Sequence, residues 1–122
     1  MNRVLTSLCF LLLAVPAYAH HSGAMFDNGK AVVLVGTVAT FEWTNPHAWV
    51  EIDVTDASGH SERWNVECSA VNIIARKGWK KESLFRGDKV TVTVHPMRDG
   101  TKGGQLMQIV LVDGTTLTDH DY

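Results

Sequence analysis

Residues 30–43, KAVVLVGTVATFEW, decide the fold that the sequence predicts. β-Branched and aromatic residues dominate this stretch, which is typical of a strand, and the stretch is longer than an average strand. Gly36 in its middle indicates a bulge or a sharp bend, by which one strand can serve both halves of a small barrel. Residues 44–47, TNPH, then end the strand because Pro46 cannot donate to a strand ladder.

Four further strands and one helix are expected downstream. The strands cover residues 48–54, 61–68, 89–94 and 105–112, in which apolar and polar side chains alternate. Residues 56–59 form the turn of a hairpin between the first two of them. The helix follows Ser69, which is a good N-cap, and Lys77-Gly78 closes its C-terminus. A loop over residues 95–104 separates the last two strands.

This order of elements, with the helix between the third and fourth strands, resembles the OB-fold. We therefore predict a mainly β protein that folds as a small five-stranded OB-like Greek-key barrel. A small open sandwich and an irregular six-stranded roll are the alternatives. The predicted organisation is a signal peptide (1–19), an extended N-terminal segment (20–29), the barrel domain (30–114) and a polar tail (115–122).

The first 19 residues predict export. Arg3 supplies a positive charge, residues 4–15 form a short apolar run, and Ala17-Tyr18-Ala19 is the small-x-small pattern that signal peptidase recognises. The apolar run is too short to span a bilayer as a helix, so cleavage leaves no integral membrane segment. We therefore expect a periplasmic or secreted protein whose first mature residue is His20.

Charge and cysteine content narrow the possible partners. The chain has 11 Lys and Arg residues against 13 Asp and Glu residues, a formal net charge of −2. This balance offers no basic surface for a polyanion, so nucleic acid is not a predicted partner. Cys68 would be the single cysteine of the mature chain, which excludes an internal disulfide, and we expect it to be buried.

Several segments resemble a family of small exported bacterial proteins of unknown function. The segments are Ala19–Ser22, Gly36–Val38, Phe41–His47, Gly87–Val90 and His95–Gly100. The resemblance covers essentially the whole mature chain, and it implies a periplasmic or secreted single domain without supplying an activity. A looser similarity to periplasmic bacterial OB-fold proteins supports the predicted fold alone.

The predicted fold brings two loops together. In an OB-fold, the loop between strands one and two and the loop between strands four and five border one ligand-binding face. Two imidazoles, a thioether, a guanidinium and two indoles would meet there, and they suit stacking and cation–π contacts. The candidates are His47, His95, Met97 and Arg98, flanked by Trp43 and Trp49. The plainer interpretation is that His47 caps its turn and His95 ends its strand.

The predicted mature N-terminus is a second source of ligands. His20 and His21 would contribute an α-amine and two imidazoles, and nitrogen-rich sites favour Cu(II), followed by Zn(II) and Ni(II). Copper is therefore the first expected cofactor and zinc the second, with His20, His21, His47 and His95 as candidate ligands. The plainer interpretation is that polar residues at a frayed terminus need no role.

Two hypotheses from different functional classes follow. The first is a periplasmic copper-binding module. The second is an OB-type module that binds a small organic ligand, a glycan or a partner protein through Trp43, Trp49 and Arg98 without a metal. A structural or accessory subunit is a third possibility. G-x-S-x-G, H-E-x-x-H and C-x-x-C motifs are absent from the sequence, so no enzyme is predicted.

Overall fold

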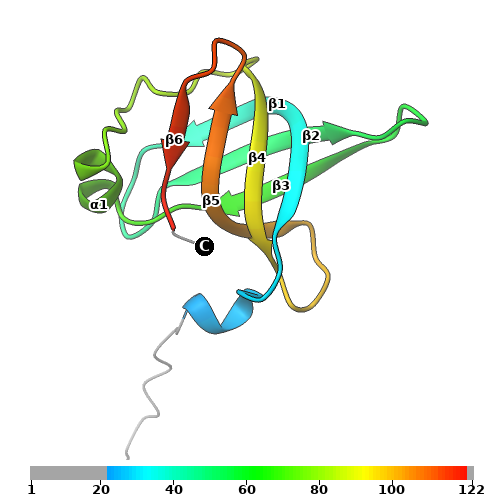
Figure 1. Cartoon of the computed structure of the whole chain (residues 1–122), viewed down its shortest axis with the longest axis horizontal. Coiled ribbons are helices and arrows are strands. Elements are labelled where there is room, and N and C mark those ends of the chain that lie inside the picture. Colours follow the sequence, from blue (N-terminus) through cyan, green and yellow to red (C-terminus); the bar gives the residue numbers. More distant parts are fainter. Residues whose placement is uncertain (1–21, 121–122) are drawn as a thin grey trace, which may run out of the picture.

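A computed structural model describes residues 22–120 of the chain (Figure 1). The elements are η1 (Ser22–Met25), β1 (Val32–Glu42), β2 (Trp49–Thr55), β3 (Ser61–Glu67), α1 (Val71–Arg76), β4 (Lys89–Pro96), β5 (Gly103–Leu111) and β6 (Thr116–Thr118), of which η1 is a short 3-10 helix. In this part of the chain, no helix is long and apolar enough to cross a membrane.

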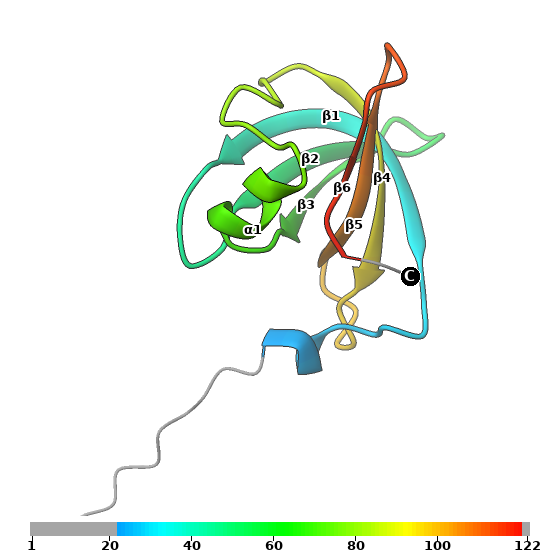
Figure 2. The same ribbon diagram turned by 60° about the vertical axis from the view of Figure 1, so that its left-hand side comes forward.

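The strands β1 to β5 close into a barrel. Antiparallel ladders join β1 to β2, β2 to β3, β1 to β4 and β4 to β5, and a short parallel ladder between β3 and β5 completes the ring. The helix α1 lies between β3 and β4 along the chain. The predicted small five-stranded OB-like barrel is therefore confirmed. Figure 2 shows how β1 arches over the barrel from its ladder with β4 to its ladder with β2.

Gly36 is the point at which β1 changes partner. It pairs with Val90 of β4 and also with Val54 of β2. A Cβ atom at this position would clash with the carbonyl oxygen of Asp53, so only glycine allows the strands to approach so closely. The expected bulge lies nearby, since the register between β1 and β2 shifts at Ala39 rather than at Gly36.

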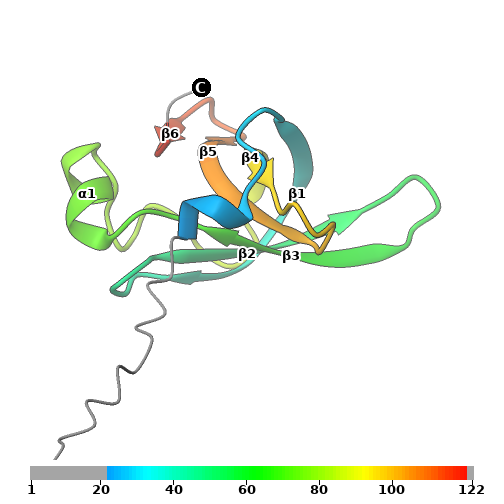
Figure 3. The ribbon, with the colours of Figure 1, turned by 90° about the horizontal axis from the view of Figure 1, so that it is seen from below.

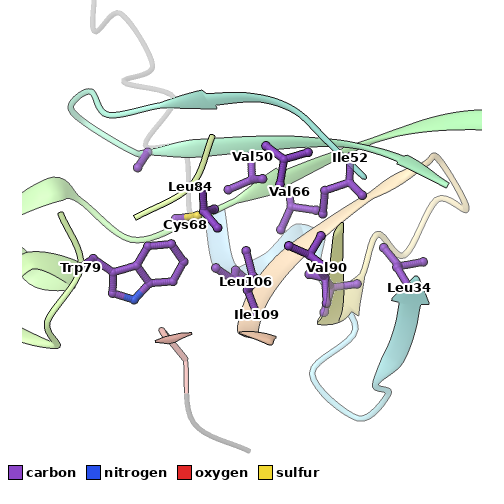
Figure 4. Packing of buried hydrophobic residues seen from close by; sticks show 14 of the residues in the cluster. Leu34, Val50, Ile52, Val66, Cys68, Trp79, Leu84, Val90, Leu106 and Ile109 are labelled. Atoms are coloured by element: carbon purple, nitrogen blue, oxygen red, sulfur yellow. The ribbon is translucent and has the colours of Figure 1, made fainter. Parts of the chain in front are cut away.

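Apolar side chains from every barrel strand fill the interior (Figure 4). Trp79, which follows α1, packs at one end of this core and is 2% exposed. Cys68 is buried as predicted, and burial raises the pKa of its thiol well above the usual value. Trp64 is only partly buried and packs against the core from its edge.

The start of α1 differs from the prediction. Ala70 is the N-cap residue and offers no capping side chain, whereas the Asn45 Oδ1 atom accepts a hydrogen bond from the Val71 N–H at 3.2 Å. Ser69 does not cap the helix because its side chain hydrogen-bonds the His120 ring instead. The helix C-terminus agrees with the prediction, and Gly78 has a positive φ of 94° there.

The segment predicted as a polar tail, residues 115–122, contains a short strand. Residues Thr116–Thr118 form β6, which pairs with β5 and places Leu117 against the core. The alternation of threonine and leucine allows this pairing, which covers the otherwise free edge of β5. The Trp79 Nε1–H donates to the Thr118 carbonyl at 2.8 Å, so β6 is also tied to the segment that follows α1.

Candidate binding site

The segment that precedes β1 is docked on the loop between β4 and β5. Phe26 forms an antiparallel bridge with Met97 and is 2% exposed. The Asp27 N–H donates to the Pro96 carbonyl at 2.9 Å, and the Arg98 N–H donates to the Met25 carbonyl at 2.9 Å. Figure 3 shows η1 across the end of the barrel at which β5 begins. The structure therefore holds residues 25–27 in one place.

A cavity of about 190 Å³ lies beside this docked segment. Its lining residues include Met25, Phe26, Met97, Trp49 and Glu67. Trp49 of β2 and Glu67 of β3 are paired across the ladder, which is why their side chains meet. Two of the predicted ligand-binding residues, Trp49 and Met97, thus share one cavity. We call it the N-terminal cavity.

His47 does not line the N-terminal cavity but contacts Glu67, which does. The His47 Nδ1 atom lies 3.3 Å from the Glu67 Oε1 atom and 3.0 Å from the Cys68 carbonyl oxygen. Both partners are acceptors, so Nδ1 carries the proton, and Nε2 keeps its lone pair in the neutral ring. Burial raises the pKa of the Glu67 carboxyl, and the positive charges of His47 and His120 oppose this increase.

His95 lies at the same end of the barrel but has a different partner. Its Nδ1 atom donates to the Lys30 carbonyl at 2.7 Å, and the residue is 7% exposed. Gln105 of β5 pairs with His95 of β4 on one side and with Glu67 of β3 on the other. Strand β5 therefore lies between His95 and Glu67, the residue that His47 contacts. Over residues 22–120, no hydrogen bond joins the two loops that carry them.

The remaining candidate residues lie in different surroundings. Trp43 packs edge-on against Phe41, with ring centroids 5.9 Å apart, and does not line the N-terminal cavity. Arg98 is exposed, and its Nη1 atom lies 4.0 Å from the Asp27 Oδ1 atom. His20 and His21 lie outside the described residues, immediately before Ser22.

Sequence reasoning missed Met25 and Glu67. Strict alternation places Glu67 on the outer face of β3, where a carboxylate is expected to be solvated, yet the residue is 5% exposed. The signal that could have located this site was the apolar pair Met25-Phe26 inside an otherwise polar segment. Such a pair favours docking onto the barrel rather than a free terminus.

A second polar cluster lies next to Cys68 but does not form a catalytic relay. The His120 Nε2 atom is 3.1 Å from the Ser69 hydroxyl and 3.9 Å from the Asp119 Oδ2 atom. A relay of the serine-histidine-aspartate type needs one ring nitrogen for each partner, whereas here the same nitrogen faces both. This cluster instead anchors the C-terminal segment, since Asp119 Oδ2 also accepts the Ser69 N–H at 2.6 Å.

The side chains available as metal donors are one criterion for the chemistry of this site, and similarity to known proteins is another. Within residues 22–120, no group of three or more His, Cys, Asp or Glu side chains is arranged to hold a metal ion. A model of a family of unknown function, DUF6152, matches residues 9–107 of the chain. No curated protein and no solved structure matches the chain.

Proposed function

The chain belongs to the DUF6152 family of unknown function, and we propose that it is an exported module that binds copper at its mature N-terminus. The signal-peptide pattern of residues 1–19 supports export to the periplasm or beyond, with His20 as the first residue. The α-amine and the two imidazoles of His20 and His21 are the main proposed ligands. Zinc is the second candidate metal, because copper binds nitrogen donors more tightly.

The docking of residues 25–27 is the observation that carries this proposal. Because Met25 is held beside the N-terminal cavity, the chain between it and His20 cannot extend beyond about 18 Å. The proposed ligands are thus tethered close to Glu67, which His47 contacts. A tethered terminus raises the effective concentration of its donors near that imidazole.

Among the described histidines, His47 is the best candidate for a fourth ligand. Histidines that bind metals usually donate their other ring N–H to a carbonyl or a carboxylate, and His47 contacts one of each through Nδ1. Its side chain is 36% exposed, so part of the imidazole is open to solvent. His95 has a similar Nδ1 contact, but the residue is nearly buried and is therefore the weaker candidate.

Isothermal titration of residues 20–122 with Cu(II) tests the proposal. We expect submicromolar binding that weakens by about tenfold or more when one extra residue blocks the α-amine of His20, because the amine is a ligand. A parallel titration with Zn(II) compares the two metals. Micromolar or weaker Cu(II) binding that does not respond to the extra residue would refute the proposal.

The position of Trp49 in the wall of the N-terminal cavity favours a second candidate function. In this alternative, the module holds a small organic ligand, a glycan or a partner protein against the Trp49 indole, with Arg98 directly after Met97 of the cavity wall. Trp43 does not support it, because that side chain packs elsewhere. Purification from the native periplasm, followed by metal analysis and mass spectrometry, distinguishes the two functions. An organic ligand without copper would favour the second.

A further inference from the structure

We propose that the N-terminal cavity is a site for a soft monovalent cation, Cu(I), held by the thioethers of Met25 and Met97. This inference rests on the copper-binding function proposed above, and it adds the oxidation state that the described residues themselves favour. The nitrogen donors of the N-terminus suit Cu(II), whereas thioether sulfur selects Cu(I). The module would then have separate donor sets for the two oxidation states.

Two methionines from different parts of the chain line this cavity. Met25 belongs to η1 and Met97 to the segment that follows β4, and both line the cavity. The bridge between Phe26 and Met97 and the bond from the Arg98 N–H to the Met25 carbonyl hold the two segments together. Met25 is 40% exposed and therefore gains less from burial than Met107, which is 1% exposed. The exposed part of Met25 leaves its side chain accessible to a ligand in the cavity.

The other walls of the cavity suit a positive charge. The Trp49 side chain supplies an aromatic surface, which attracts cations. The Glu67 carboxylate is 5% exposed and lines the same cavity, so a bound cation would compensate its charge. Lys102 also lines the cavity, but its ammonium group has other partners. Its Nζ atom lies 3.2 Å from the Glu62 Oε2 atom and 5.5 Å from the centroid of the Trp64 ring.

The donor set argues against a harder metal at this position. Zn(II) and Cu(II) sites in proteins use several imidazole, thiolate or carboxylate ligands. Over residues 22–120, no three such side chains are arranged to hold a metal ion, and Glu67 is the one carboxylate that lines the cavity. Two neutral sulfurs and a single carboxylate match the charge and the softness of Cu(I).

Methyl NMR of the chain from residue 20 to 122, labelled at the methionine methyl groups, tests this site. Ag(I) serves as the redox-stable probe, and Cu(I) is added under anaerobic conditions as the second probe. We expect both ions to shift the methyl signals of Met25 and Met97 and to leave that of Met107 unchanged. Met107 is an internal control because it is buried and does not line the cavity.

Two substitutions complete the test. We expect Met97→Leu to weaken Ag(I) binding by at least the roughly 10–100-fold that loss of a group bonded to a metal ligand causes. The matched control, Met107→Leu, should bind Ag(I) like the unchanged chain. Undiminished Ag(I) binding by both Met97→Leu and Met25→Leu, or unmoved Met25 and Met97 signals in excess Ag(I), would overturn the inference.

One further variant separates this inference from the copper proposal for the N-terminus. The extra residue that blocks the His20 amine should reduce Cu(II) binding but leave the Ag(I)-induced shifts of Met25 and Met97 in place. If the blocked chain loses those shifts, the ion belongs to the N-terminus and the cavity site is wrong. Unmoved methyl signals alongside tight, amine-dependent Cu(II) binding would reject the cavity site and retain the proposed function.

Discussion

At the scale of single residues, the contact between His47 and Glu67 is the feature with the most chemical content. The imidazole donates through Nδ1 to acceptors that are buried or part of the backbone, which orients the ring and determines its tautomer. Glu67 is the acidic residue of this contact and also a wall of the N-terminal cavity. Its burial makes its ionisation sensitive to whatever occupies that cavity.

The raised pKa of Glu67 predicts how stability depends on pH. A carboxyl with a higher pKa in the folded state binds more protons in that state than in the unfolded state. Its contribution to stability is therefore complete below the unfolded pKa and falls as pH rises through the folded pKa. Glu67→Gln removes this loss, and we expect the free energy of unfolding to be higher than that of the unchanged chain at pH 7 without metal. Urea denaturation at pH 4 and pH 7 measures the effect.

Glu82→Gln is the matched control for this prediction, because Glu82 is exposed. It should change the free energy of unfolding by less than about 0.5 kcal/mol at either pH. A Glu67→Gln variant that is less stable than the unchanged chain at pH 7 would mean that the ionised carboxylate is stabilising in its contact with His47.

We expect substitutions of the two histidines to have opposite effects on stability and on Cu(II) affinity. His95→Ala leaves the Lys30 carbonyl without its buried donor, so we expect a loss of about 1–3 kcal/mol in stability and little change in Cu(II) affinity. His47→Ala removes a partly exposed ring, so stability should fall by about 1 kcal/mol or less, while Cu(II) binding weakens. Thermal denaturation and calorimetric titration of both variants test this division, and equal Cu(II) affinity in both would contradict it.

At the scale of elements, β1 joins the two halves of the barrel. Its first part pairs with β4 and its second part with β2, and Gly36 is shared by both ladders. The loop that follows β1 supplies two further contacts. Asn45 accepts a hydrogen bond from the first turn of α1, and His47 reaches the end of β3. A single strand with its loop therefore connects the barrel, the helix and the candidate site.

Gly36→Ala tests this role of β1. The added methyl group would clash with the Asp53 carbonyl and with the Ile52 side chain, so the strands must move apart, at a cost of about 1–3 kcal/mol or more. Chemical denaturation measures the loss. Gly23→Ala is the control, because a Cβ atom there has no neighbour within 4 Å, and it should change stability by less than about 0.5 kcal/mol. Equal stability of the two variants would show that β1 has room at Gly36.

At the scale of the whole molecule, the docked N-terminal segment predicts that ligand binding and folding are coupled. Phe26 is buried by the same contacts that position Met25 and Met97. A ligand that binds only the folded state raises its stability by about 2.7 kcal/mol at a concentration of 100 times the Kd. Copper should therefore stabilise the whole domain rather than the N-terminus alone.

Phe26→Ala tests this coupling. We expect the variant to lose roughly 3 kcal/mol of stability, because a fully buried aromatic side chain is removed. It should also lose most of the increase in melting temperature that Cu(II) or Ag(I) causes in the unchanged chain. Differential scanning calorimetry with and without the ions measures both effects. An undiminished increase in the variant would show that metal binding does not depend on the docked segment.

The sequence by itself determined the five barrel strands, the helix and the fold class. Alternation in β2, β3 and β4, the breaks at Pro46 and at the glycines, and the bend at Gly36 are local properties of the chain. They predict the barrel because each strand has one buried face. Sequence also identified Trp49 and Met97 as neighbours, since the fold brings their loops to one face.

Only the tertiary structure decided which residues share the cavity. Local alternation cannot show that Glu67 is buried, because Met25 and Phe26 come from a segment more than 40 residues away in the chain. The same is true of the helix cap from Asn45 and of β6, whose pairing depends on the free edge of β5. The physical reason is that burial and hydrogen bonding between distant segments depend on how the barrel closes.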